Sequence, residues 1–194
     1  IDEINIAGLK IYTTLDADLQ NAAQTAMRKN LSRLETILHG FSPEPRDKYQ
    51  YLRELKPDRF IYGKIKDITG DQADNYKIIL SLGLAEGVIK TNSLIRYAKL
   101  LNLANGKGYK YNLEKMIKNL APGDILFTQV LSYNSKNQTA VLDIQKRPKI
   151  SGGLVALDKG EVRTIISGFD TQGYNRALFA KRQPGSVFKS IVFL

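Results

Sequence analysis

One stretch decides how the middle of the chain folds: Phe60-Ile61-Tyr62-Gly63-Lys64-Ile65-Lys66-Asp67-Ile68-Thr69. Its isoleucine, tyrosine and phenylalanine side chains favour a β-strand, and Gly70-Asp71 then signals a turn. Four similar runs follow at residues 76–82, 87–90, 125–133 and 139–145, and helical patches at 94–103 and 113–120 separate the third run from the fourth. This is the element order of an OB-type barrel, so we predict a small OB-like antiparallel β-barrel domain within an α+β chain.

The N-terminal part predicts a strand followed by a long helix. Residues 10–14 alternate weakly and suit a short strand. From residue 15 to residue 38 apolar side chains recur at spacings of three and four, which predicts an amphipathic helix with Asp16 as its N-cap and Gly40 as its end. We expect its apolar stripe to pack in a core. We expect His39, the only histidine, to cap the helix C-terminus rather than act as a catalyst.

Prolines divide the chain into three predicted segments. Two prolines within residues 43–45 mark the first boundary, and Pro148 marks the second. The segments are 1–42, a linker strand and helix; 43–150, the inserted OB-like β-domain; and 151–194, a third segment. In this third segment residues 154–157 and 162–167 predict a β-hairpin.

The C-terminal end carries a serine three residues before a lysine, Ser186 and Lys189. If Ser186 opens a helix, both side chains lie on one face, one turn apart. A lysine whose pKa is lowered by burial or a nearby cation can take the serine proton, and the helix N-terminus can stabilise a developing oxyanion. A chain of this composition contains about one Ser-x-x-Lys by chance, so a serine N-cap followed by a solvated lysine remains the alternative.

Composition excludes several kinds of site. Lys and Arg number 29 against 19 Asp and Glu, a net charge of +10 that favours contact with nucleic acid, anionic lipid or an acidic wall polymer. The absence of cysteine excludes disulfides, thiolate zinc sites and a cysteine nucleophile. A lone histidine disfavours a Ser-His triad, so lysine is the expected base. We expect no metal and no cofactor. No apolar run is long enough to span a bilayer, and residues 1–5 do not resemble a signal peptide.

Several separated motifs resemble, in order and spacing, the class A penicillin-binding proteins, which are bifunctional peptidoglycan synthases. Near the N-terminus, Gly8-Leu9-Lys10-Ile11-Tyr12-Thr13-Thr14-Leu15-Asp16 resembles the segment joining their glycosyltransferase and transpeptidase domains. Four further stretches resemble the start of their transpeptidase domain. These are Gly152-Gly153-Leu154-Val155-Ala156-Leu157-Asp158, Ile165-Ile166-Ser167-Gly168-Phe169-Asp170, Tyr174-Asn175-Arg176-Ala177 and Arg182-Gln183-Pro184-Gly185-Ser186-Val187-Phe188-Lys189.

The resemblance implies a serine acyl-transfer site. Ser186 would attack the carbonyl of a D-Ala-D-Ala stem peptide, Lys189 would act as base, and a β-lactam would acylate the same serine. The backbone N–H of Ser186 would supply half of the oxyanion hole. Ser190 stands where the family usually has proline. The family's Ser-x-Asn and Lys-Thr/Ser-Gly motifs do not follow Ser186 here, and Ser132-Tyr133-Asn134 precedes it, so we reject that match as chance.

The resemblance also implies a setting. The chain is expected to be an internal part of a bifunctional glycosyltransferase/transpeptidase, comprising the linker, an inserted OB-like domain and the opening of a serine β-lactamase-like transpeptidase domain. Alone it is expected to be inactive. The implied partners are peptidoglycan stem peptides and glycan strands, β-lactams, and a regulatory protein at the inserted domain. The implied location is the periplasmic side of the inner membrane, with an N-terminal anchor outside this chain.

Two non-enzymatic alternatives remain open. The basic OB-like domain could bind glycan or single-stranded nucleic acid, or it could be a scaffold that positions two catalytic domains or docks a regulator. Nucleic acid is the weaker of these interpretations, because the resemblance implies an inserted β-domain that docks a regulator or acts as a spacer. The tyrosines that would supply stacking faces also suit half-buried strand and helix positions better. These tyrosines are Tyr62, Tyr76, Tyr97, Tyr109 and Tyr111.

Overall fold

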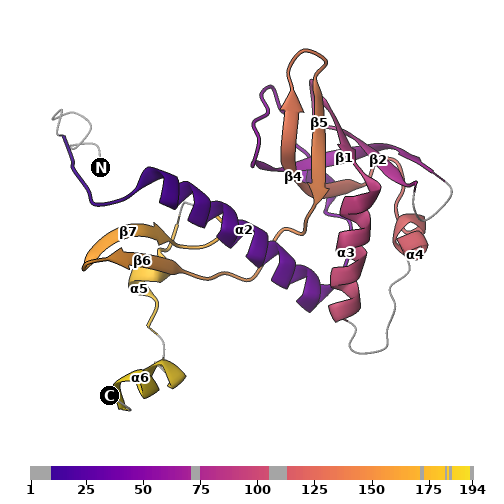
Figure 1. Cartoon of the computed structure of the whole chain (residues 1–194). Helices are drawn as coiled ribbons and strands as arrows, with labels where there is room; N and C mark the ends of the chain where they lie inside the picture. Colours follow the sequence, from indigo (N-terminus) through magenta and orange to yellow (C-terminus); the bar gives the residue numbers. More distant parts are fainter. Residues whose placement is uncertain are drawn as a thin grey trace. The chain divides into compact units, whose positions relative to one another are not determined.

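The computed structural model describes residues 10–70, 75–104, 113–170, 173–181, 183 and 185–192 (Figure 1). Several features discussed above lie outside these residues: Gly8 and Leu9 of the linker motif, the turn residue Asp71, Tyr109, Tyr111, Arg182 and Pro184. The chain forms two compact units, residues 29–150 and residues 1–28 with 151–194. Each unit is described below by itself.

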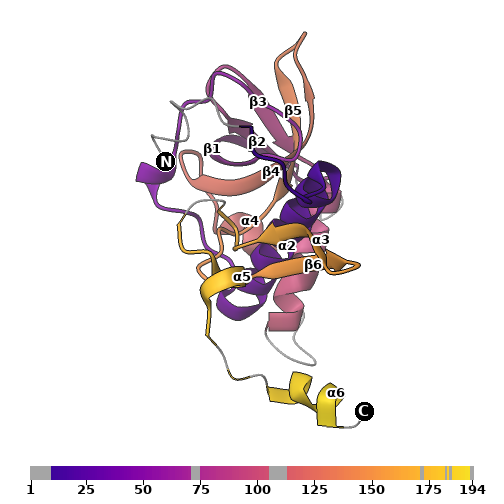
Figure 2. The same ribbon diagram turned by 90° about the vertical axis from the view of Figure 1, so that its left-hand side faces the viewer.

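The unit of residues 29–150 contains a closed five-stranded barrel with the strand order β1-β2-β3-β5-β4 (Figures 1 and 2). Its strands are β1 (Phe60–Thr69), β2 (Lys77–Ser81), β3 (Glu86–Ile89), β4 (Ile125–Asn134) and β5 (Thr139–Ile144). The helices α3 (Thr91–Ala104) and α4 (Leu113–Lys118) lie between the third and fourth strands in sequence. The predicted OB-like element order is therefore confirmed.

One pairing departs from the predicted antiparallel barrel. Strand β3 pairs with β5 in parallel, with Val88 opposite Val141, while the other four pairings are antiparallel. A parallel pair needs a long connection, and α3, α4 and β4 supply it here. The parallel pairing closes the barrel, so every one of its strands has a neighbour on both sides.

The barrel core follows the alternation of its strands. Ile61 and Ile65 of β1 and Ile78 and Leu80 of β2 point inward and are buried. Helix α3 adds Leu94 and Leu101, and α4 adds Met116, all of them buried in the same cluster. Burial of one apolar stripe explains why both helices form at these places.

A close backbone contact joins the turn between β2 and β3 to the segment that precedes β1. The backbone N–H of Leu52 donates to Leu82 O at 3.1 Å, and that of Leu84 donates to Leu52 O at 3.3 Å. Gly83 lies between them with φ of +104°, and a Cβ atom there would lie 2.6 Å from Leu52 N and from Leu52 O. Only glycine allows both this backbone conformation and this approach.

We therefore expect Gly83→Ala to lower the free energy of unfolding of this unit by about 2 kcal/mol. Gly123→Ala is the matched control, because Gly123 also has a positive φ of +94° but nothing lies within 4 Å of its Cβ position. The control should cost about 1 kcal/mol, from backbone strain alone. Urea unfolding followed by circular dichroism measures both; equal losses would show that the contact with Leu52 does not constrain residue 83.

The unit of residues 1–28 and 151–194 is built on a β-hairpin. Strands β6 (Leu154–Asp158) and β7 (Glu161–Ile166) pair antiparallel, as predicted, across a turn in which Lys159 and Gly160 have φ of +50° and +86°. The start of helix α2 lies along β7 (Figure 1). Gln20 donates to Ile165 O at 2.9 Å and accepts from Ile165 N at 3.0 Å, so its side chain replaces a neighbouring strand at this edge.

Residues 10–14 do not form the predicted strand. Thr14 Oγ1 donates to Val162 O at 2.7 Å and Asp16 N donates to Arg163 O at 2.8 Å, but the side chains of Ile11 and Tyr12 are 68% and 88% exposed. The residue types favour a strand, but stable pairing needs cross-strand side-chain contacts, which these exposed residues lack.

Helix α2 (Ala17–His39) begins and ends as predicted. Asp16 Oδ1 accepts from Leu19 N at 2.9 Å, and Gly40 has φ of +68°. The predicted core stripe is wrong along both halves of the helix, because Leu15, Leu19, Leu34 and Leu38 are exposed. Of the residues in that stripe only Leu31 is buried, and it lies beside polar neighbours. These polar neighbours are Ser32, Glu35 and Thr36.

Candidate active site

Ser186 and Lys189 lie in one short helical segment near the C-terminus. Ser186 belongs to the 3-10 helix η2 (Gly185–Phe188), and Lys189 begins α6 (Lys189–Val192). Gly185, with φ of +54°, turns the chain into this segment. Residues three apart in a 3-10 turn lie above one another, so the backbone directs both side chains to one side.

The chemistry of this pair depends on what surrounds it. A lysine serves as a base when burial or a nearby cation lowers its pKa, and acyl transfer also needs water excluded. The structure leaves both Ser186 and Lys189 exposed. The described residues therefore place the candidate nucleophile and the candidate base at helical spacing, but they form no enclosed pocket around them.

The chain before Ser186 is held by helix α5 (Arg176–Phe179). Asn175 Oδ1 caps this helix, accepting from Ala177 N at 3.1 Å and Leu178 N at 3.3 Å. A Cβ at Gly153 would lie 2.9 Å from Ala177 N, so glycine lets the start of β6 approach the helix closely. A cavity of about 570 Å³ in this unit is bordered by residues 151–155, 174, 176, 177, 180 and 181. Gly153 and Asn175 thus have a structural role in positioning α5, which precedes the candidate nucleophile in sequence.

Comparison with known proteins shows which family this arrangement belongs to. The sequence is 28% identical to penicillin-binding protein 1A of Aquifex aeolicus and of Pseudomonas aeruginosa, in each case over 96% of this chain and 22% of the relative. It is also 28% identical to penicillin-binding protein 1A of Rickettsia felis, over 100% of this chain and 23% of the relative. The chain belongs to the class A penicillin-binding proteins. It spans less than a quarter of the length of these relatives.

The other two comparisons give no further information about the function or the fold of this chain. No protein-family model matches it. Among solved structures, GSP13 from Bacillus subtilis is 17% identical over 47% of this chain and 56% of its own, with a TM-score of 0.30. An uncharacterised protein, MJ1198 from Methanocaldococcus jannaschii, is 15% identical over 50% of this chain and 99% of its own, with a TM-score of 0.29. The assignment of the barrel rests on its strand pairing.

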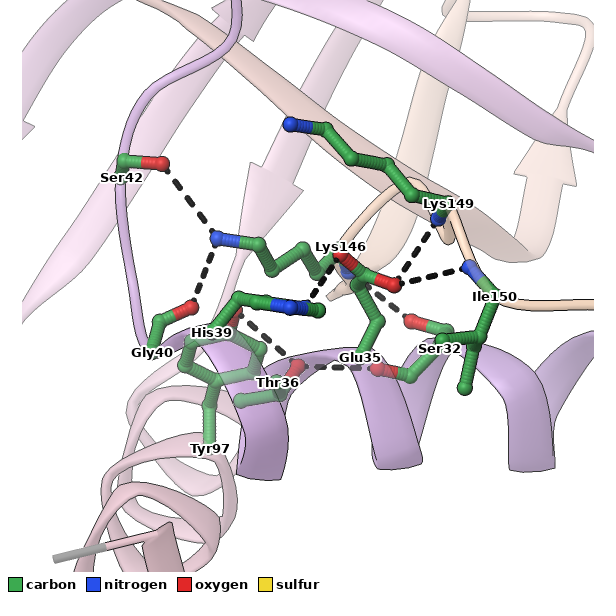
Figure 3. A network of polar contacts seen from close by, with 10 residues as sticks. All are labelled: Ser32, Glu35, Thr36, His39, Gly40, Ser42, Tyr97, Lys146, Lys149 and Ile150. Carbon is green, nitrogen blue, oxygen red and sulfur yellow. Dashed lines mark hydrogen bonds and ion pairs between the residues drawn. The ribbon is translucent and has the colours of Figure 1, made fainter.

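A second polar site of this penicillin-binding protein chain lies on the last turns of α2 (Figure 3). Glu35 is fully buried, and its Oε2 accepts from Lys149 N at 2.8 Å and Ile150 N at 3.1 Å. Ser32 Oγ accepts from Lys146 N at 2.9 Å. These contacts hold residues 146–150, the segment after β5, against the helix. We call Ser32, Glu35, Thr36, His39, Lys146 and Lys149 the α2 polar cluster.

Electrostatics within the α2 polar cluster favour an ionised Glu35. Burial alone would raise the pKa of Glu35, but the N–H groups of Lys149 and Ile150, together with the imidazole of His39, lower it below its ordinary value of 4.5. His39 Nδ1 lies 2.8 Å from Glu35 Oε1. The predicted capping role of His39 is therefore wrong: the imidazole pairs with a carboxylate one turn earlier in its own helix.

The side chain of Lys146 hydrogen-bonds to residues that follow the C-terminal end of α2. Its Nζ donates to Gly40 O at 2.7 Å and to Ser42 Oγ at 3.3 Å (Figure 3). Burial lowers the pKa of Lys146, although Glu44 and Glu35 oppose this shift. Burial also raises the pKa of Glu44, although a bond from Arg147 N and the charge of Lys146 act in the other direction. Lys146 thus satisfies a helix-end carbonyl that would otherwise lack a donor.

The α2 polar cluster is not among the features predicted from the sequence, although the sequence carries a signal for it. Ser32, Glu35, Thr36 and His39 recur at three, four and seven, the spacing of one helix face. The arrangement is structural rather than catalytic, because its groups bond to one another and to backbone. Within the described ranges, no three histidine or acidic side chains are placed to hold a metal ion. No helix in the same ranges has both the length and the hydropathy of a membrane span.

Proposed function

We propose that this chain serves peptidoglycan synthesis as part of a longer, bifunctional glycosyltransferase/transpeptidase. Residues 1–42 would be the linker, residues 43–150 the inserted OB-like domain, and residues 151–194 the opening of the transpeptidase domain. The observation that carries this proposal is the match over 96% or more of the chain to relatives named penicillin-binding protein 1A. The helical placement of Ser186 and Lys189 supports it.

In the proposed reaction, Ser186 Oγ attacks the carbonyl carbon between the two D-alanines of a stem peptide, and its proton passes to Lys189 Nζ. The backbone N–H of Ser186 donates to the oxygen that becomes negative. The peptide bond then breaks, the terminal D-alanine leaves with a proton, and an acyl ester remains on Ser186. An amine of a neighbouring strand attacks this ester, forms the cross-link and restores the serine hydroxyl. A β-lactam would acylate the same hydroxyl.

This activity implies an extracytoplasmic location, in the cell envelope, with the membrane anchor outside this chain. The α2 polar cluster supports a spacer role for the barrel, since it fixes the segment leaving β5 to the helix that enters the domain. A nucleic-acid-binding role is poorly supported. Tyr76 and Tyr97, two of the tyrosines considered as stacking faces, are only 8% and 3% exposed, and a buried ring cannot stack on a base.

We predict that the 194-residue chain alone does not react with penicillin. The printed sequence lacks the Ser-x-Asn and Lys-Thr/Ser-Gly motifs after Ser186, and Ser186 and Lys189 are exposed. A fluorescent penicillin, incubated with this chain and with the complete synthase, should label only the complete protein in a denaturing gel. Stoichiometric labelling of the 194-residue chain would show that its own residues suffice for acylation.

A further inference from the structure

A cavity of about 400 Å³ lies in the barrel unit, between the second half of α2, helix α3 and strands β4 and β5. This volume is within the range of small-ligand sites. All of its lining residues belong to the unit of residues 29–150. Neither Ser186 nor Lys189 is among its lining residues, and Thr36 is the one member of the α2 polar cluster among them.

The cavity has an excess of positive charge. Lys29 and Arg33 are exposed, lie one turn apart on α2, and have no ion-pair partner among the described residues. Like charges at this spacing repel one another, and a bound anion would relieve the repulsion. Arg96 contributes a third cation, but it pairs with Asp143. Asp143 is itself satisfied, because Ser93 and Gln145 also donate to it, so the net charge left for a ligand is positive.

One of the residues that line the cavity has a hydrogen-bond acceptor without a donor. Gln129 of β4 is fully buried and lines the cavity. Its Nε2 donates to Asp58 Oδ1 at 2.9 Å, while its Oε1 has no hydrogen-bond partner among the described residues. Buried acceptors are rarely left unpaired, so this oxygen suits a ligand that carries an O–H or N–H group.

The remaining lining favours a sugar over a nucleobase or an extended peptide. Tyr97, the cavity's aromatic residue, is 3% exposed and packs edge-on against Phe41 with ring centroids 5.7 Å apart, so it offers no stacking face. Strands β4 and β5 are paired on both sides, which leaves no free edge for a peptide strand. Leu131 is 47% exposed and, with Leu100, provides an apolar surface for the C–H face of a sugar ring.

We propose that this cavity binds an acidic sugar unit of a glycan strand that carries no stem peptide, with its free carboxylate on Lys29 and Arg33 and its ring against Leu131. The hydroxyl or amide N–H of the sugar is the donor for Gln129. Binding here needs neither Ser186 nor Lys189, so it goes beyond the proposed acyl transfer. A glycan strand held at this place would be retained by the synthase independently of the transpeptidase reaction.

The test compares two sugars that differ in one acidic group. N-acetylmuramic acid and N-acetylglucosamine are titrated into the ¹⁵N-labelled 194-residue chain, and amide shifts are followed by NMR. We expect saturable shifts at residues 29–33, 96–100 and 129–131 with the acidic sugar, and binding of the neutral sugar weaker by about fivefold or more. Arg33→Gln and Lys29→Gln should each weaken binding of the acidic sugar about fivefold. Lys99→Gln, an exposed change on α3 outside the cavity lining, should leave it unchanged.

Several outcomes would overturn this inference. Equal binding of the two sugars, or no saturable shift with either, would remove the acidic-sugar assignment. Binding that is insensitive to Arg33→Gln would place the ligand elsewhere. Tighter, salt-dependent binding of an oligothymidylate or of an acidic peptide would assign the cavity to that class instead. None of these results concerns penicillin acylation of Ser186, so either proposal can be contradicted without affecting the other.

Discussion

Ser186→Ala should abolish penicillin acylation of the complete synthase while leaving its fold unchanged. The substitution removes the only atom proposed to form the acyl ester, so we expect labelling by a fluorescent penicillin to fall to background. Lys189→Ala should also lower the acylation rate, by about 100-fold or more, because the serine would lose its general base. Labelling kinetics in a denaturing gel, with thermal unfolding as the check on folding, measure both effects.

The matched control is Ser190→Ala, which removes a hydroxyl from the same helical segment, where the family usually has proline. It should keep the rate of labelling within about twofold, since a change away from the reacting atoms has little effect on the barrier. Undiminished labelling of the Ser186→Ala protein, or equal losses in Ser186→Ala and Ser190→Ala, would show that Ser186 is not the nucleophile.

Glu35→Ala should destabilise the barrel unit by about 3 kcal/mol, because it removes a buried charge that accepts from two backbone N–H groups and pairs with His39. Urea unfolding of the 194-residue chain, followed by circular dichroism, measures the loss. Glu54→Ala is the control. Glu54 is exposed and pairs with Lys56 at 3.1 Å on the surface, so its removal should change stability by less than about 0.5 kcal/mol.

The contribution of Glu35 should also depend on pH. Because the pKa of Glu35 in the folded chain lies below 4.5, its carboxylate stabilises the fold fully above about pH 4.5. This stabilisation is lost as the pH falls through the lower, folded-state pKa. Glu35→Gln should therefore lose less stability than the wild type between pH 4.5 and more acidic values. A pH profile that is unchanged by Glu35→Gln would mean that the carboxylate is not held as an ion.

Local sequence signals were sufficient for most of the secondary structure. The strand β1 is predicted at its observed bounds because its residue types and the following Gly70 act locally. The same holds for Asp16, which caps α2 through a bond to Leu19 N three residues later. The OB-like order followed from the succession of such local elements. The parallel pairing of β3 with β5 could not be predicted, because strands far apart in sequence decide it.

Long-range contacts decided what the sequence reasoning missed. The end of α2 carries an apolar row with Leu34 and Leu38 beside a polar row with Glu35, and periodicity cannot tell which row is buried. The segment 146–150 decides it, because its N–H groups need acceptors and reach Glu35. In the candidate site, the spacing of Ser186 and Lys189 predicted a shared helical turn, but the surroundings that would activate them cannot be derived from four residues.

Peptide mapping by mass spectrometry tests most directly whether Ser186 is the residue acylated in the complete synthase. The complete protein is treated with benzylpenicillin, digested and analysed for the residue that carries the added mass. We predict a single adduct on the peptide containing Ser186, at its serine oxygen. An adduct on any other residue, with the Ser186 peptide recovered unmodified, would contradict the account.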